Sequence, residues 1–78
     1  MKQPALCPED GAIFVGHVQE IEGAFQAVCH AELHRGNESL VEMPEYFVTE
    51  THEKALAWVS GMARSRGFQT WKDTSAQI

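Results

Sequence analysis

Residues 51–67 are the one stretch of this 78-residue chain with a clear helical period, and the rest of the sequence is typical of strands and turns. Its apolar stripe has spacings of three, four and seven residues and comprises Ala55, Leu56, Val59, Met62, Ala63 and Arg66. Thr51 fits the N-cap position, because its hydroxyl can accept a hydrogen bond from a first-turn amide. Gly67 fits the left-handed position that ends a helix. The sequence therefore predicts one helix, with Phe68 folding back onto its last turn.

Two residues inside the predicted helix do not belong to its apolar stripe. Gly61 weakens a helix by roughly 1 kcal/mol relative to alanine, which indicates a place where a strand or side chain packs close. The indole of Trp58 either covers the edge of a sheet or serves as an exposed anchor for another chain. Trp58 is therefore a second possible contact point for a partner.

Residues 12–21 and 24–35 are rich in β-forming side chains, and the second run alternates along its whole length. The alternation defines a core face of Phe25, Ala27, Cys29, Ala31 and Leu33. The outer face of the same run consists of Gln26, Val28, His30, Glu32 and His34. Glu22-Gly23 predicts a two-residue hairpin turn, which pairs Val18 with Ala27 and Phe14 with Ala31.

The predicted register leaves apolar side chains on both faces of the first strand. Its core-facing residues are Phe14, Gly16 and Val18. Its outer residues are Ile13, Val15 and His17, beside Glu32, His30 and Val28. A register slip of one residue would exchange the two faces. In either register, a two-sided strand in so short a chain indicates that something covers the outer face, and a second copy is the simplest candidate.

The remaining strands are shorter. A third extended run covers residues 39–48, and Pro44 places it at a sheet edge, bulges it or splits it in two, because proline cannot donate to a ladder. Residues 68–72 alternate between apolar and polar side chains and predict a last short strand. The predicted fold is α+β, with a small antiparallel sheet of three to four strands and one helix on one face, in the order β-β-β-α-β. A flexible arm (residues 1–11), one domain (residues 12–72) and a frayed tail (residues 73–78) complete the organisation.

The net charge of −5 is distributed unevenly along the chain. Residues 1–53 carry two basic and ten acidic groups, whereas residues 54–78 carry four basic groups and one acidic group. An acidic sheet repels phosphate backbones, so nucleic-acid binding is not favoured. No apolar run is long enough to cross a membrane, and the first residues do not resemble a secretory signal. We therefore expect a cytoplasmic protein without a membrane partner.

Few residue patterns in the chain point to chemistry. His30, Glu32 and His34 lie on one strand face and are of the types that bind zinc, although same-face positions are about 6.5–7 Å apart. Cys29 and His30 point to opposite faces, which disfavours a nucleophile and base pair. The sequence has no Gly-rich phosphate loop and no Gly-x-Ser-x-Gly motif. We predict no enzymatic activity, no catalytic residue, no cofactor and no bound metal.

The element order resembles that of known small modules. Three strands followed by a helix, with Thr51-His52-Glu53-Lys54-Ala55-Leu56 at the junction, are loosely similar to HicB-like antitoxins and double-stranded-RNA-binding-like domains. The resemblance covers topology and a helix cap. It implies no activity, because such folds host many functions.

We expect a small regulatory or binding domain that contacts another protein or forms a homodimer through its outer sheet face or a strand edge. The residues predicted to make this contact are Val15, His17, Val28, His30 and Trp58. One alternative is a nucleic-acid-binding regulator that uses Arg64, Arg66 and Lys72. The other alternative is a metal-binding protein with its site at His30, Glu32 and His34.

Overall fold

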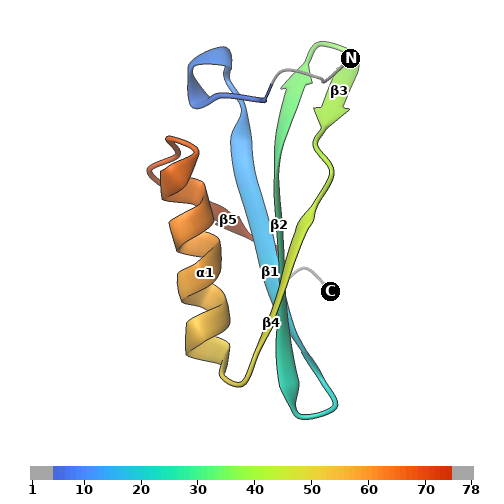
Figure 1. Ribbon diagram of the computed structural model, residues 1–78. Coiled ribbons are helices and arrows are strands. Elements are labelled where there is room, and N and C mark those ends of the chain that lie inside the picture. Colours follow the sequence, from blue (N-terminus) through green and yellow to red (C-terminus); the bar gives the residue numbers. More distant parts are fainter. Residues whose placement is uncertain (1–4, 75–78) are drawn as a thin grey trace.

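A long antiparallel hairpin forms the centre of the sheet in the computed structural model, which describes residues 5–74 (Figure 1). Strands β1 (Ile13–Ile21) and β2 (Ala24–Arg35) are joined by Glu22 and Gly23, whose φ angles of 49° and 82° are those of a type I′ turn. Val18 pairs with Ala27, and Phe14 pairs with Ala31. The predicted turn and register are therefore confirmed.

Pro44 splits the third predicted run into β3 (Glu38–Val41) and β4 (Glu45–Thr49). β3 pairs with residues 32–35 of β2, and β4 pairs with residues 25–29. Since β1 occupies the other side of β2, β3 and β4 follow one another along the same edge of the sheet. Of the three predicted effects of Pro44, the edge position and the split are both observed.

The helix α1 (His52–Ser65) packs on one face of the sheet (Figure 1). Thr51 caps it, because its Oγ1 accepts a hydrogen bond of 3.1 Å from Lys54 N. At the other end, Gly67 has a φ of 87° and donates to Arg64 O, while Phe68 N donates to Ala63 O. These two bonds form a Schellman motif, which satisfies carbonyl groups at the helix end. Both predicted helix ends are confirmed.

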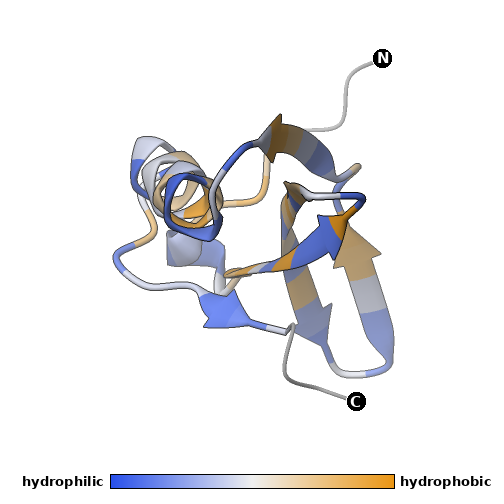
Figure 2. Ribbon diagram, turned by 90° about the horizontal axis from the view of Figure 1, so that it is seen from below, coloured by the Kyte–Doolittle hydropathy of each residue, from blue (hydrophilic) through white to orange (hydrophobic). Residues whose placement is uncertain are grey.

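The core lies between α1 and the helix-facing side of the sheet. Figure 2 shows the helix on one side and the alternation of hydrophobic and hydrophilic residues along the strands. The buried side chains that pack together are Ala12, Phe14, Val18, Ala27, Cys29, Ala31, Leu33, Ala55, Val59, Ala63 and Phe68. This set contains the predicted core faces of β1 and β2, apart from the half-buried Phe25 and the glycine at position 16.

Two glycines differ in what surrounds them. A Cβ on Gly16 would lie 2.8 Å from Val59 Cγ1, so glycine lets the helix approach β1 closely. Gly61 has no heavy atom within 4 Å of the position that a Cβ would take. The prediction that another group packs close to Gly61 was therefore wrong, because this position lies on the exposed side of the helix.

The last strand is shorter and later than predicted. β5 (Lys72–Asp73) pairs with Val15 and Gly16 of β1 in parallel, so the sheet is mostly antiparallel with one parallel pair. Phe68 instead packs on Phe14, with ring centroids 5.3 Å apart. The predicted strand at residues 68–71 was wrong, because the buried Phe68 directs this segment toward the core before it reaches the sheet edge. The observed order is β-β-β-β-α-β.

The segments before β1 and after β5 are partly described. Residues Pro8–Asp10 form one 3-10 turn, η1, and Thr74 N donates to Gly16 O over 2.8 Å. Residues 1–4 and 75–78, on which the predicted arm and tail partly fall, lie outside the described residues. The predicted division into arm, domain and tail stays a prediction.

Candidate functional site

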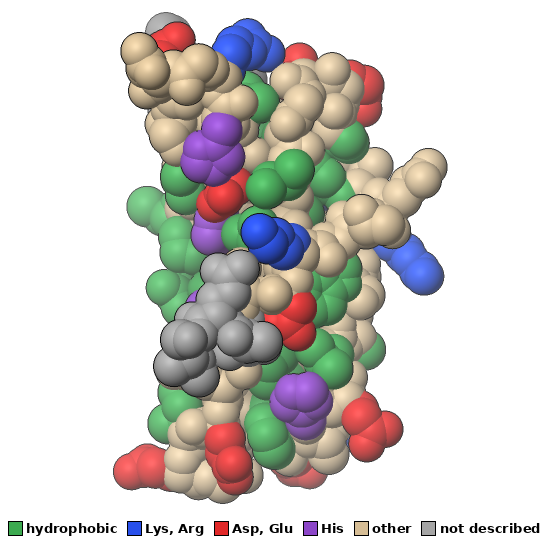
Figure 3. All heavy atoms as spheres, turned by 180° about the vertical axis from the view of Figure 1, so that it is seen from behind, with side chains coloured by type: hydrophobic (Ala, Val, Ile, Leu, Met, Phe, Trp, Pro, Cys, Tyr) green, Lys and Arg blue, Asp and Glu red, His purple; other side chains and the backbone are tan. Residues whose placement is uncertain are grey.

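The sheet face away from α1, called here the outer face, carries most of the large exposed apolar side chains of the described strands. Residues that pair directly across neighbouring strands point to the same face. His17, Val28 and Tyr46 therefore form one row across β1, β2 and β4. Ile13, Glu32 and Val41 form another row across β1, β2 and β3. Figure 3, which views the molecule from behind, shows hydrophobic side chains interspersed with histidine and acidic side chains.

The exposure of these side chains is high for residues of their type. Tyr46 is 59% exposed, Val48 is 61% exposed and Val41 is 56% exposed. Ile13 and Ile21 of β1 are also exposed on this face. An apolar surface of this kind is a common mark of a protein-binding region.

Within the described strands, the outer face holds few acidic groups, although the chain is acidic. Among the described strand residues, the registers place only one carboxylate on this face, that of Glu32, and Lys72 of β5 is opposite Val15. The other carboxylates of the described strands pair with residues of the helix-facing side of the sheet. They are Glu20, Glu38, Glu45 and Asp73. A second acidic copy could therefore approach the outer face without strong repulsion between carboxylates.

Four of the five predicted contact residues do lie together on the outer face. His17 pairs with Val28, and Val15 pairs with His30 on the adjacent row. His17, Val28 and His30 are half-buried, but Val15 is only 5% exposed. Val15 therefore offers a partner little surface, and its contribution would be to support its neighbours.

Trp58, the fifth predicted contact residue, lies on the other side of the sheet. Its indole stacks on Phe47 of β4 with ring centroids 5.2 Å apart and an angle of 15° between the planes. Trp58 is half-buried and packs against the core. The interpretation that its indole covers the sheet edge agrees with this contact.

His30, Glu32 and His34 form a hydrogen-bonded chain along β2. The two carboxylate oxygens of Glu32 accept from Nε2 of His30 and from Nε2 of His34, each over 2.9 Å. The bonds from His34 and then His30 hold the pKa of Glu32 below its ordinary value, although burial acts in the opposite direction. Within residues 5–74, no three His, Cys, Asp or Glu side chains are grouped to hold a metal ion. A metal ion bound through the two Nε2 atoms and the carboxylate would have to replace both of these hydrogen bonds.

The three basic residues of the nucleic-acid hypothesis are not brought together as one patch. Arg66 Nη2 lies 2.6 Å from Glu42 Oε2 and donates to Leu6 O over 3.1 Å. Arg64 lies on the exposed side of α1, whereas Lys72 belongs to the outer face. Since Arg66 is already paired, a phosphate group would have to displace a carboxylate to reach it.

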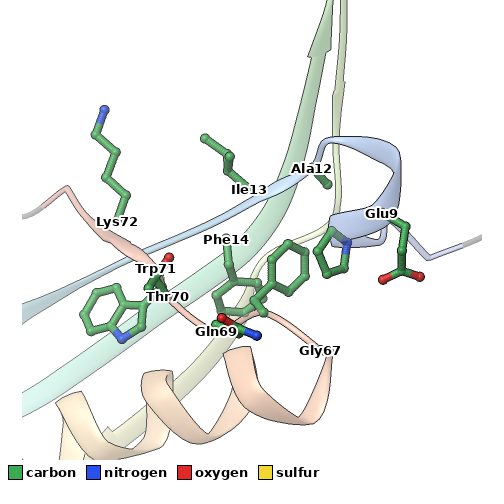
Figure 4. A pocket seen from close by; sticks show the side chains of 11 residues that line it. Glu9, Ala12, Ile13, Phe14, Gly67, Gln69, Thr70, Trp71 and Lys72 are labelled. Carbon is green, nitrogen blue, oxygen red and sulfur yellow. The ribbon is translucent and has the colours of Figure 1, made fainter.

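An open hollow of about 830 Å³ lies between the start of β1 and residues 67–72. In Figure 4, Phe14 and Trp71 point toward the helix, while Ile13 and Lys72 point the other way. Trp71 Nε1 donates to Ser60 Oγ over 3.0 Å, which fixes the indole against α1. The charged lining residues Glu9 and Lys72 lie at opposite ends of the hollow (Figure 4), so they do not converge on one ligand.

Sequence reasoning missed Val41, Tyr46 and Val48 as members of the outer face. They stand in the run interrupted by Pro44, where the two halves pair with different parts of β2. The period-two alternation of Tyr46 and Val48 around Phe47 was a usable signal, because it separates these residues from Phe47 by face. Assigning the face itself required the pairing of Tyr46 with Val28.

The helix of the described part is too short and too polar to cross a membrane.

Comparisons with known proteins do not add a family to this geometry. No protein-family model matches the chain, and neither the curated proteins nor the solved structures contain a match to it.

Proposed function

We propose that this chain is a small, non-enzymatic binding domain that associates with a second copy of itself and uses its outer sheet face for protein contacts. The observation that carries the proposal is the exposure of Tyr46, Val48 and Val41 on a face that holds a single strand carboxylate among the described residues. Exposed apolar surface in a chain this small favours association, because burying that surface adds to a marginal core.

Residues on the two faces of the same sheet edge provide a matched test. Tyr46 of β4 is 59% exposed on the outer face, and Leu40 of β3 is 48% exposed on the helix side. Tyr46→Lys is expected to weaken self-association at least about tenfold, a change of about 1.4 kcal/mol. Leu40→Lys is expected to leave it nearly unchanged.

Sedimentation equilibrium of the two variants and the unchanged chain measures this difference. Far-UV circular dichroism of each variant checks that the fold is retained. Equal association of all three proteins would exclude the outer face as the contact surface, and a monomer at every concentration would exclude self-association.

A further inference from the structure

The unpaired edge of β4 presents backbone groups in a defined pattern. Glu42 N donates to Ala31 O, so Ala31 directs its backbone groups toward the edge that β3 and β4 occupy. Residues two apart along a strand direct their backbone groups to the same side, so Cys29, Ala27 and Phe25 do likewise. Their partners in β4 are Glu45, Phe47 and Thr49. The N–H and C=O groups of Tyr46 and Val48 consequently point away from β2, to the open side of the strand.

The centre of this edge, Tyr46 to Val48, carries no proline, charge or bulge that would protect it against strand pairing. Within the described residues, β4 pairs with β2 and with no strand on its other side. Residues 45–49 contain no proline, lysine or glycine, and their pairing with β2 has no bulge. Tyr46, Phe47 and Val48 are all exposed. An exposed, apolar and regular edge of this kind is a template for another strand.

We propose that two copies of the chain associate by antiparallel pairing of β4 with β4, with Phe47 facing Phe47 of the partner subunit. In this register, Tyr46 pairs with Val48 of the partner subunit, and the reverse pair forms by symmetry. The pairing uses the outward groups of both residues and forms about four backbone hydrogen bonds. The inference rests on the proposed self-association and assigns it to one edge.

Neighbouring registers are less favourable. Centring the pairing on Tyr46 would place Val48 opposite Pro44 of the partner subunit, which has no N–H to donate. Centring it on Val48 would place Tyr46 opposite Glu50 of the partner subunit, beyond the end of β4. Centring it on Phe47 sets an aromatic side chain beside a β-branched one on the outer face, a favourable cross-strand pair.

The charges along β4 agree with this symmetric pairing. Glu45 would lie opposite Thr49 of the partner subunit, so carboxylates do not face each other directly. The two outer faces would then join in one continuous sheet surface across the seam. The backbone groups of Tyr46 and Val48 point to the open side of β4, and a two-fold axis pairs each of these residues with the other in the partner subunit. A second copy therefore fits this edge.

Disulfide cross-linking tests the register. Facing residues of a non-hydrogen-bonded antiparallel pair are close enough for a disulfide. In a Cys7→Ser background, Phe47→Cys is expected to form a covalent dimer with oxidised glutathione at least about tenfold faster than Thr49→Cys. The control cysteine at position 49 would lie opposite Glu45 of the partner subunit and far from position 49 of the partner subunit. Cys29 stays in both proteins because it is buried.

A backbone change tests the edge itself. Val48→Pro removes an N–H that points away from β2, a position where an edge strand tolerates proline. It is expected to keep the fold by circular dichroism and to weaken dimerisation at least about tenfold. Val48→Thr keeps the N–H and the branched shape, and is expected to dimerise like the unchanged chain within about twofold.

The outcomes separate this inference from the proposed function. Fast cross-linking of Phe47→Cys supports edge pairing even if Val48→Pro fails to fold. Suppose that the chain dimerises, that Tyr46→Lys abolishes dimerisation, and that position 47 cross-links no faster than position 49. This result would overturn the β4 edge pairing and keep the outer face as the contact surface. A chain that stays monomeric overturns both.

Discussion

Gly16 of β1 lies directly beneath Val59 of α1, so that a Cβ added at position 16 would be 2.8 Å from Val59 Cγ1. The same Cβ would be 3.1 Å from the carbonyl oxygen of Val28, which is backbone and cannot rotate away. The helix and the strand therefore pack in direct contact at this point, on the side of the sheet opposite the outer face.

Gly16→Ala is therefore expected to lower the free energy of unfolding by about 1–3 kcal/mol, the usual cost of overpacking. Val59→Ala removes one of the clashing atoms, so the double variant should lose less than the sum of the two single changes. Urea denaturation of the four proteins measures this coupling. Additive losses would show that Gly16 and Val59 do not constrain each other.

Gly61→Ala is expected to have the opposite effect. The position is helical and exposed, and an added Cβ would meet no heavy atom within 4 Å. Alanine should raise the free energy of unfolding by up to about 1 kcal/mol through helix propensity alone. A loss of stability in thermal or urea unfolding would mean that the open space at Gly61 is filled in solution.

The Glu42–Arg66 ion pair should make stability depend on pH. Burial raises the pKa of Glu42, but hydrogen bonds from Arg66 and Leu6 N and the guanidinium charge outweigh it, so the net pKa is lowered from 4.5. A lowered pKa contributes stability that is present above the ordinary value and is lost as the pH falls through the lowered one.

Glu42→Gln is accordingly expected to cost about 1–2 kcal/mol at neutral pH, with the difference from the unchanged chain shrinking toward pH 3. Urea unfolding at a series of pH values measures it. Glu38→Gln on the exposed β3 is the control and should change stability by less than about 0.5 kcal/mol at any pH. A pH-independent cost at Glu42 would contradict the role of its charge.

The two thiols should differ in reactivity. Burial, followed by the charge of Glu45, raises the pKa of the Cys29 thiol to about 11, and this side chain has no exposed surface. Cys7 is half-buried. Iodoacetamide at pH 8 should modify Cys7 in the folded chain and both thiols in denaturant, as mass spectrometry would show, because the reactive species is the thiolate. Rapid modification of Cys29 in the folded chain would be inconsistent with its burial.

The parts of the fold that local rules determine were predictable from the sequence. Glu22-Gly23 specifies a tight turn, and the alternation of residues 24–35 then sets the register of the whole β1–β2 hairpin. Thr51 and Gly67 mark the helix ends through hydrogen bonds within a few residues. These features depend on neighbours in the chain, which a sequence displays directly.

The parts that depend on distant pairing were not predictable in the same way. Phe68 continues an alternating pattern, yet its ring packs on Phe14, far away in the sequence. The exposure of Val15 could not be read from its face, because β5 pairs beside it. For the candidate site, the outer-face residues of β1 and β2 followed from the hairpin, whereas Tyr46 joined them through the pairing of β4 with Val28.

Sedimentation equilibrium of the unchanged chain, from about 1 µM to about 500 µM, tests the central claim of self-association most directly. The apparent mass is expected to rise with concentration from 8.7 kDa toward that of a dimer, and to rise less in Tyr46→Lys than in Leu40→Lys. An apparent mass that stays at 8.7 kDa across the whole range would contradict the claim.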